Sequence, residues 1–335
     1  MRKCIITGLG GRGRHWLNIC NNHAGVEAVA FVEPMEANKK LAVDAGADAS
    51  TIHDSIDKAL DAAGDIDFVL DVTPPAVHHD IAAATFERKL NLLGEKPLSD
   101  NYATAKKVVE QGKAAGVTHM ITQNYRFRPT VRTLAGLVAD DTIGRPGQVD
   151  MRFYMPWADF PGTHYVTEPY MLINDMMVHH FDLMRYVVGA IPVAVTAVSW
   201  NHSWGWHKGD AAHIVVFEFE GGLFGTHTSI GCSIGERTSW NGDWRIEGPK
   251  GSLSMTNEKI RHAWLHRTDS PIDKEIPAGN FPEGEASVMD EFLAALDEGR
   301  QPECNAEDNL HSVAMVFGAI ESAKQGRKVA ISELG

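Results

Sequence analysis

Cysteine is scarce in this chain, and the four cysteines present (Cys4, Cys20, Cys232 and Cys304) are widely separated. No Cys-x-x-Cys spacing occurs, which argues against a disulfide scaffold and a structural zinc site and is typical of a reducing compartment. Long hydrophobic runs are lacking too, since no stretch reaches the about 18 apolar residues of a membrane-spanning helix. The apolar residues 4–9 are too few for a secretory signal and predict a first buried strand. We therefore expect a cytoplasmic protein.

Basic residues are outnumbered by acidic ones, with 31 Lys and Arg against 44 Asp and Glu and a formal net charge of −13. A surface with this charge repels phosphate backbones and anionic lipids, so we expect no nucleic-acid partner and no membrane partner. The length of 335 residues and the hydrophobic fraction of 44% are sufficient for two domains with sizeable cores.

Short apolar runs alternate with helical patterns over residues 1–122. Strands are expected at 3–7, 28–32, 67–72, 91–94 and 118–122, and helices at 14–22, 36–45, 55–63, 76–88 and 102–115. Continuous apolar strands separated by helices are required by a parallel sheet that is covered on both faces. The sequence therefore predicts an α/β Rossmann domain, a doubly wound parallel sheet, over residues 1–122.

The pattern changes after residue 124, where apolar and polar residues alternate at 149–155, 215–220 and 244–247. A period of two indicates strands with one face in solvent, and such sheets are mostly antiparallel. Helices are expected at 174–188, 286–296 and 307–323. We predict an α+β domain over residues 123–335, with an open sheet that helices cover on one face. Because the other face must also be covered, we expect a homodimer or homotetramer formed through the sheet.

A glycine-rich segment, G-L-G-G-R-G at residues 8–13, follows the first expected strand and opens the first expected helix. In this spacing Gly8 permits a tight turn, Gly10 lets backbone amides approach a pyrophosphate, and Gly13 lets the helix pack on the sheet. Together with Gly11 and Arg12, these residues predict a dinucleotide-binding loop.

Glu33 ends the second expected strand at the distance from the glycine loop where a carboxylate meets the adenosine ribose hydroxyls. A carboxylate at this position repels a 2′-phosphate, which favours NAD over NADP as the cofactor. NADP stays open as an alternative because Arg12, Lys39 and Lys40 could neutralise its phosphate, and a surface role stays open for Glu33.

The fourth expected strand runs into Glu95-Lys96-Pro97. Ligands bind at the carboxyl ends of the strands in open α/β sheets, and Pro97 favours an extended conformation for Lys96. An ammonium group at this edge can stabilise a developing alkoxide or polarise a carbonyl. A solvated lysine is the alternative interpretation.

The expected helix at 174–188 is mostly apolar but carries Asp175, His179, Asp182 and Tyr186 at spacings that place them on one face. Polar groups on a buried helix must be hydrogen-bonded or must line a cleft. The stripe therefore has two interpretations, a hydrogen-bonded core network with Asp175 as helix cap, or the wall of an active site.

The segment at 157–165 is rich in aromatic and polar residues and precedes this helix. Trp157 and His164 from this segment, together with Arg126 and Trp240, suit a sugar or cyclitol ring, although a long connection with packed aromatic residues explains the segment equally well. The histidine pairs at 78–79 and 179–180 lack a third ligand at a suitable spacing, so we expect no metal site.

Several motifs together resemble the glucose–fructose oxidoreductase, inositol dehydrogenase and rhizopine-catabolism (Gfo/Idh/MocA) family, along essentially the whole chain. They are the loop at 8–13, T-P-P-A-V-H at 73–78, E-K-P at 95–97, N-Y-R-F-R-P at 124–129, D-x-x-x-H-x-x-D at 175–182, and the hairpin at 244–253. One departure is Met177, where family members usually carry glycine.

The resemblance implies an NAD(P)-dependent dehydrogenase or reductase acting on a CH–OH group of a sugar, cyclitol or related polyol. His179 would be the general acid/base, Lys96 would stabilise the alkoxide-like oxygen, and Asp175 would orient His179 or bind a neighbouring hydroxyl; Asp175 and His179 would thus also bind the substrate.

The family pattern also implies that Thr73, His78, Glu95 and Lys96 lie along the cofactor, in addition to the glycine loop. Two alternative functions remain open within such a family. One is an NAD-dependent glycoside hydrolase that acts by transient oxidation and elimination. The other is a nonenzymatic regulator that senses NAD or a sugar, although this chain retains the three residues expected to be catalytic.

Overall fold

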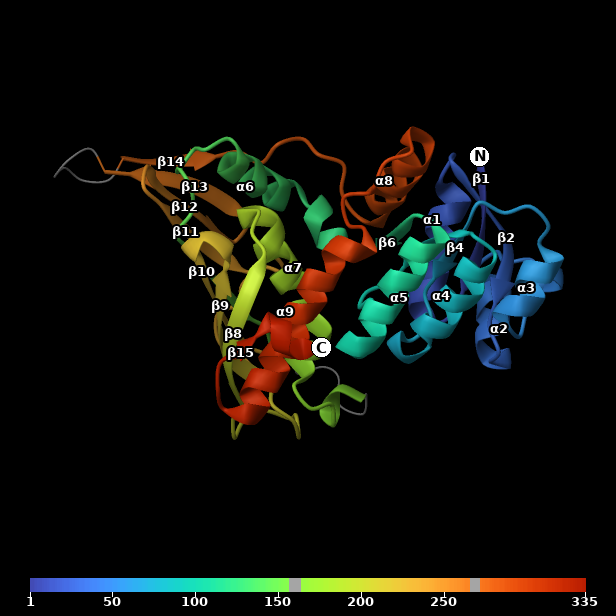
Figure 1. Ribbon diagram of the computed structural model, residues 1–335, viewed down its shortest axis with the longest axis horizontal. Coiled ribbons are helices and arrows are strands. Elements are labelled where there is room, and N and C mark those ends of the chain that lie inside the picture. Colours follow the sequence, from blue (N-terminus) through green and yellow to red (C-terminus); the bar gives the residue numbers. More distant parts are fainter. Residues whose placement is uncertain (157–163, 266–271) are drawn as a thin grey trace. The chain divides into compact units, whose positions relative to one another are not determined.

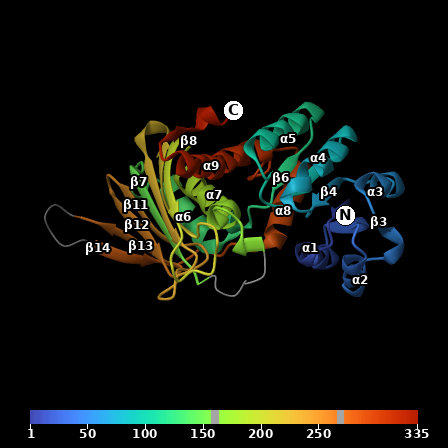
Figure 2. The same cartoon turned by 90° about the horizontal axis from the view of Figure 1, so that it is seen from below.

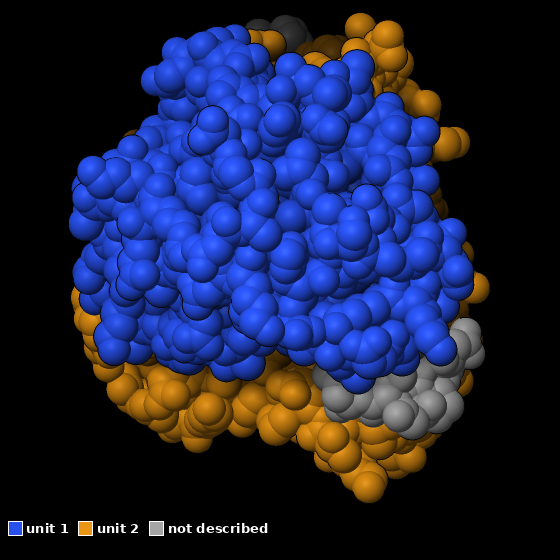
Figure 3. Space-filling model, turned by 90° about the vertical axis from the view of Figure 1, so that its right-hand side faces the viewer, with its two compact units in different colours: residues 1–124, 283–310 blue, residues 125–282, 311–335 orange. Residues whose placement is uncertain are grey.

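The computed structural model describes residues 1–156, 164–265 and 272–335 of the chain. They form two compact units, coloured separately in Figure 3: unit 1 comprises residues 1–124 and 283–310, and unit 2 comprises residues 125–282 and 311–335. The predicted domain boundary at 122 is close to the first change of unit. The prediction of a second domain that is continuous to residue 335 needs correction, because residues 283–310 pack with unit 1.

Unit 1 contains a six-stranded parallel sheet in the order β3-β2-β1-β4-β5-β6, the doubly wound arrangement that the sequence predicts. Its strands are β1 (Arg2–Thr7), β2 (Val26–Val32), β3 (Ile52–His53), β4 (Phe68–Asp71), β5 (Asn91–Gly94) and β6 (His119–Ile121). Its helices are α1 (Gly11–Asn22), α2 (Glu36–Asp44), α3 (Ile56–Ala62), α4 (His78–Glu87), α5 (Tyr102–Ala115) and α8 (Glu285–Glu298). The two-residue strand β3 is not predicted, because it is too short to show a periodicity.

Helix α8 belongs to unit 1 because its side chains complete the core of that unit. The ring of Phe292 packs edge-on against Phe68 of β4, with the ring centroids 5.0 Å apart. Arg2 of β1 forms an ion pair with Asp297 at 2.7 Å. After α8, the carbonyl oxygen of Cys304 accepts a hydrogen bond from the backbone N–H of Ile121 in β6. The returning segment therefore contacts three strands of the sheet.

Unit 2 contains a nine-stranded sheet in the order β14-β13-β12-β11-β7-β10-β9-β8-β15. Its strands are β7 (Gln148–Tyr154), β8 (Pro192–Trp200), β9 (Ala212–Phe219), β10 (Phe224–Ile230), β11 (Asp243–Gly248), β12 (Gly251–Thr256), β13 (Lys259–Trp264), β14 (Ile272–Ile276) and β15 (Val329–Ala330). The pair β7–β10 is parallel, and the other pairs are antiparallel. The predicted open, mostly antiparallel sheet is confirmed.

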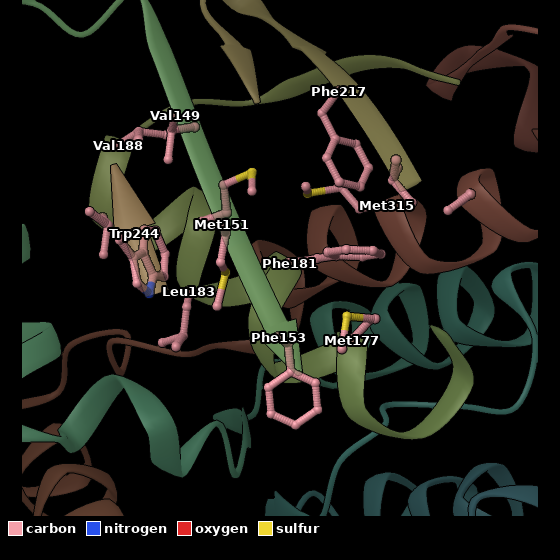
Figure 4. Packing of buried hydrophobic residues seen from close by; sticks show 14 of the residues in the cluster. Val149, Met151, Phe153, Met177, Phe181, Leu183, Val188, Phe217, Trp244 and Met315 are labelled. Carbon is pink, nitrogen blue, oxygen red and sulfur yellow. The ribbon is translucent and has the colours of Figure 1, made fainter. Parts of the chain in front are cut away.

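Helices cover one face of this sheet, as Figures 1 and 2 show. They are α6 (Pro129–Ala139), α7 (Met177–Val188) and the part of α9 (Ala306–Gln325) that lies in unit 2. Alternate residues of β7, such as Met151 and Phe153, point to the helical side and pack with Phe181 of α7 and Met315 of α9 (Figure 4). Helix α6 is not predicted, although Pro129 at its first position and apolar residues at 131, 134 and 138 are a usable helical signal.

The opposite face of the sheet exposes apolar side chains on β8, β9 and β10. Val198 is 62% exposed, Ile214 is 45% exposed, and Phe224 is 48% exposed. Toward β7 and β11 the same face carries charged residues, including Asp150 and Arg245. Within the described part of the chain, each helix is too short or too polar to cross a bilayer.

Candidate active site

The glycine loop connects β1 to α1, and its glycines fall into two kinds. Gly8 has a φ of +81°, and a Cβ at Gly13 would lie 1.8 Å from the carbonyl oxygen of Gly8. These two positions therefore need glycine for the fold itself. A Cβ at Gly10 or Gly11 would meet nothing within 4 Å, so the backbone at the start of α1 borders open space. No side chain caps this helix start, which leaves its amides suited to a pyrophosphate and fits a bound dinucleotide.

Glu33 lies at the end of β2, as the sequence predicts, and is buried. Its Oε2 accepts a hydrogen bond from the backbone N–H of Leu9 at 2.9 Å, and its Oε1 accepts one from Met35 at 2.9 Å. The Nδ2 of Asn38 donates to Oε2 at 3.2 Å. The carboxylate therefore fixes the glycine loop to the end of β2, and contact with a ribose would use its remaining acceptor capacity.

Two of the three cations that could neutralise a 2′-phosphate, Lys39 and Arg12, have carboxylate partners. The Nζ of Lys39 lies 2.7 Å from Glu36 and 2.7 Å from Asp54, and hydrogen bonds to these two carboxylates raise the pKa of Lys39 to about 12. Arg12 pairs with Glu95 at 2.6 Å and with Glu285 at 2.9 Å. Pairing of this kind reduces the positive charge available to a 2′-phosphate.

Asp71 links the carboxyl ends of β1 and β4. Its Oδ1 accepts hydrogen bonds from the hydroxyls of Thr7 and Thr73, each at 2.7 Å. The ring of His78 lies 2.8 Å from the carbonyl oxygen of Thr73 and 3.0 Å from that of Pro97. The predicted cofactor residues Thr73 and His78 thus join the loops that follow β4 and β5. Asp71 is missed by the sequence reasoning, although an aspartate at the end of an apolar strand is a usable signal.

Glu95 connects the glycine loop to Lys96. Its Oε1 accepts hydrogen bonds from the Nε of Arg12 at 2.6 Å and from the indole N–H of Trp16 at 2.8 Å. Its Oε2 accepts one from the backbone N–H of Lys96 at 3.1 Å. Glu95 is 6% exposed, so these charge-assisted bonds act in a dry environment where they are strong. The Lys96–Pro97 peptide bond is cis.

The helix predicted at 174–188 has two parts. Residues Leu172–Met176 form a π-helix, and the α-helix α7 begins at Met177. Asp175 lies in the π-helical turn, where the hydroxyl of Tyr165 donates to its Oδ2 at 3.4 Å. Burial and Asp175 raise the pKa of Tyr165 to about 12. His179 lies in the first turns of α7 and is buried. Asp175 and His179 thus occupy the same end of this helical segment, in a π-turn of a kind often found at functional sites.

Asp182, the next residue of the predicted polar stripe, lies in a buried hydrogen-bonded network. Asp182 is buried and forms a bidentate ion pair with Arg126, whose Nε and Nη2 each donate to a carboxylate oxygen at 2.6 Å. Asp182 also accepts a hydrogen bond from Ser312 at 2.7 Å, and the guanidinium of Arg126 lies 5.2 Å from the ring centre of Tyr186. Arg126, which the sequence analysis expects to bind substrate, is thus buried in an ion pair that joins α7 to the segment before α6. Such a pair is strongly destabilising to break.

The structure gives no side-chain contacts for two other predicted substrate residues. Trp157 lies outside the described residues. His164 begins a short 3₁₀-helix, His164–Val166, whose first side chain is likewise outside the description. Both stay expectations.

His180, the second histidine of the pair at 179–180, begins a hydrogen-bonded chain of three buried histidines. The Nδ1 of His180 is 3.0 Å from the Nε2 of His227, and the Nδ1 of His227 is 3.0 Å from the Nε2 of His213. The Nε2 of His180 is 2.9 Å from the carbonyl oxygen of Trp240. Because a carbonyl accepts, His180 must donate from Nε2, and neutral rings then donate in turn along the chain.

Burial keeps these rings uncharged. It is the main cause that lowers the pKa of His180 and of His213 to about 3, and it places the pKa of His227 well below its usual range. His213 and His227 were missed by the sequence reasoning, although the alternation of β9 and β10 places both on the inner face of the sheet. Among the described residues, no group of three or more His, Cys, Asp or Glu side chains is arranged to hold a metal ion.

Comparison with known proteins assigns the chain to a family. A model described as the oxidoreductase family with an NAD-binding Rossmann fold matches residues 2–123, and a model of the GFO/IDH/MocA C-terminal domain matches residues 131–254. The uncharacterized protein y4oX of Sinorhizobium fredii is 31% identical over 283 residues, which are 80% of this chain and 78% of that protein. The chain belongs to the Gfo/Idh/MocA oxidoreductase family.

Other known proteins are similar over nearly their whole length. The inositol 2-dehydrogenase of Rhizobium meliloti is 24% identical over 359 residues, covering 98% of each protein. A solved oxidoreductase from Agrobacterium radiobacter, in complex with NAD⁺, L-tartaric acid and magnesium, has a TM-score of 0.88 at 18% identity and covers 100% of this chain and 99% of its own. The resemblance seen in the motifs is confirmed, and with it an NAD-binding Rossmann domain in an oxidoreductase.

Proposed function

We propose that this chain is an NAD-dependent dehydrogenase that oxidises a secondary hydroxyl of a sugar, cyclitol or related polyol, or reduces the corresponding ketone. The observation that carries the proposal is the Glu95 carboxylate, which bonds Arg12 of the glycine loop with one oxygen and the backbone of Lys96 with the other. This arrangement holds a lysine at the carboxyl edge of the sheet, beside the loop that suits a dinucleotide.

The proposed roles follow from the chemistry of alcohol oxidation, in which the alcohol loses a hydride from carbon and a proton from oxygen. Bound NAD supplies the hydride acceptor. His179 takes the hydroxyl proton, because a neutral imidazole is a suitable base near neutral pH. Lys96 stabilises the negative charge that develops on the same oxygen, and Asp175 orients His179 or binds a neighbouring hydroxyl. In the reductive direction His179 returns the proton.

The substrate class is supported by the relatives and by the side chains near the catalytic helix. The similar protein from Rhizobium meliloti is an inositol 2-dehydrogenase, which acts on a cyclitol. Trp240, whose carbonyl oxygen is bonded to His180, is 44% exposed and offers an aromatic face to a sugar ring. NAD is the proposed cofactor over NADP, because Glu33 is an acid and Lys39 is paired with two carboxylates.

The test is the production of NADH and NADPH by purified protein over a panel of sugars, cyclitols and sugar acids, with keto-sugars in reverse. Reduction of NAD with one substrate class is the expected result. His179→Ala and Lys96→Ala should then lower kcat by about 10²–10⁴-fold. Lys113→Ala, in an exposed ion pair with Glu307, is the control and should retain activity. Release of product from aryl glycosides without net NADH would instead indicate the hydrolase, and wild-type turnover in both alanine variants would contradict the assigned roles.

We also propose that the chain forms a homodimer or homotetramer through the outer face of the nine-stranded sheet, and that it works in the cytoplasm. Val198, Ile214 and Phe224 give this face an apolar half whose burial would be favourable. The four cysteines are buried free thiols, which suits a reducing compartment.

A further inference from the structure

The imidazole of His179 lies flat on the ring of Tyr125. The two ring centroids are 4.2 Å apart, and the ring planes differ by 9°. Both residues are almost fully buried, at 6% and 8% exposure. A stack contacts the face of an imidazole, whereas both nitrogens lie in its plane. Tyr125 therefore restrains the plane of the His179 ring without using either nitrogen.

The other face of Tyr125 is covered by a guanidinium group. The Cζ of Arg128 lies 3.5 Å from the ring centroid of Tyr125. This is a short cation–π distance, at which the attraction is substantial when the pair is shielded from water. Tyr125 is thus held between a cation on one face and the candidate catalytic imidazole on the other, and Arg128 blocks movement of the ring away from His179.

Arg128 is fixed in turn by the segment at 240–241. Its Nη1 donates to the Oδ1 of Asn241 at 2.7 Å, and the indole N–H of Trp244 donates to the carbonyl oxygen of Asn241 at 2.7 Å. The preceding carbonyl, that of Trp240, accepts from His180 at 2.9 Å.

These contacts form a closed circuit. It runs from His179 through Tyr125, Arg128 and the 240–241 segment to His180, which follows His179 on α7. General acid/base catalysis needs the imidazole within hydrogen-bond reach of the reacting oxygen, so a device that fixes the ring matters to the rate.

We propose that Tyr125, held in place by Arg128, is a positioning residue for His179. The proposal rests on the proposed function, in which His179 is the acid/base. It assigns to Tyr125 the orientation of a catalytic ring, with no direct part in proton or hydride transfer.

The kinetic test compares Tyr125→Phe, which keeps the aromatic face, with Tyr125→Leu, which removes it at similar volume. Tyr125→Phe should stay within about threefold of wild type, whereas Tyr125→Leu should lower kcat by about 10- to 100-fold, the scale set by small misplacements of reacting groups. KM and the affinity for NAD should change little in both variants. Phe219→Leu, in the core of the same unit, controls for the loss of a buried aromatic ring and should keep kcat.

A spectroscopic measurement tests the stack without turnover. In protein labelled with ¹³C-histidine, the ring protons of His179, assigned by comparison with His179→Gln, should show the upfield shift of a stacked ring. That shift should persist in Tyr125→Phe and disappear in Tyr125→Leu.

The two readouts separate failure of this proposal from failure of the proposed function. An unchanged kcat in Tyr125→Leu, an equal loss in Phe219→Leu, or a His179 shift that does not depend on Tyr125 would overturn the positioning role. An absence of turnover in wild type would overturn the proposed function alone, because the spectrum still reports the stack. If Tyr125→Leu does not fold, Arg128→Gln replaces it, since glutamine can still bond Asn241 but removes the cation. It should lower kcat several-fold and weaken the His179 shift, and wild-type values for both would overturn the proposal.

Discussion

Acidification from pH 6.5 to pH 5.5 is expected to destabilise the protein, because His180, His213 and His227 are folded in a neutral state. Burial lowers the pKa of the first two to about 3 and that of the third well below its usual range. In the unfolded chain a histidine has a pKa of about 6.5. The unfolded state therefore binds more protons below this value, and the stabilisation present above pH 6.5 is lost as the pH falls toward 3.

The magnitude follows from the number of protons taken up on unfolding. Each proton changes the free energy of unfolding by about 1.4 kcal/mol per pH unit once the unfolded histidine is fully protonated. Averaged over the partial protonation between pH 6.5 and 5.5, each histidine contributes about 1 kcal/mol, and the three together about 3 kcal/mol. That is a large part of the 5–15 kcal/mol typical of a folded protein. The carboxylates whose pKa values are lowered, such as Asp67 and Glu285, titrate below this window.

Urea unfolding followed by tryptophan fluorescence at pH 7.5, 6.5 and 5.5 measures the effect. His227→Gln is the informative variant, because an amide can donate to His180 and accept from His213 but does not titrate. Its loss of stability between pH 6.5 and 5.5 should be about 1 kcal/mol smaller than that of wild type. His79→Gln, at an exposed position, should behave as wild type. Identical pH dependence in wild type and His227→Gln would refute the reasoning.

Four further variants have expected outcomes. Gly10→Ala should keep the melting temperature, because its Cβ meets open space in the protein, but it should weaken NAD binding by at least tenfold in calorimetry, because that space is where the pyrophosphate approaches the backbone. Gly13→Ala should prevent folding, because its Cβ would lie 1.8 Å from a carbonyl oxygen. Equal behaviour of the two variants would contradict the division of roles in the loop. Asp182→Asn should cost about 3–5 kcal/mol in urea unfolding by leaving Arg126 buried without its charged partner, and a loss below about 1 kcal/mol would show that the pair is less important than its burial suggests. Ile214→Glu should give a lower mass in light scattering than wild type if the outer sheet face joins subunits, and an unchanged mass would exclude this half of the face.

The features that the sequence predicts well are those encoded by neighbouring residues. The sequence distinguishes parallel from antiparallel sheets because residues 68–70 are continuously apolar whereas residues 149–153 alternate. The glycine loop was located because strand, turn and helix follow one another within a short segment. The two-residue strand β3 lacks such a local signal, since pairing with β2 determines it.

The site was less predictable because its contacts join distant parts of the chain. The sequence identified His179 as a candidate but could not show that Tyr125 lies on its ring, or that His180 faces His227. The ion pair between Arg126 and Asp182 is not visible in the sequence for the same reason, because the two residues are 56 positions apart and only the fold brings them together. The regular spacing from Asp175 onward also assumed an unbroken α-helix, which the π-helical turn at 172–176 replaces.

The return of residues 283–310 to unit 1 has a consequence for synthesis on the ribosome. Residues 1–124 emerge first, but Phe68 and Arg2 receive their partners from a helix that is translated roughly 170 residues later. At 5–20 residues per second this delay lasts about 10–30 s. During that interval Phe68 and Arg2 lack their partners from α8, so a truncated chain that ends near residue 200 should bind holding chaperones that the full-length chain does not bind.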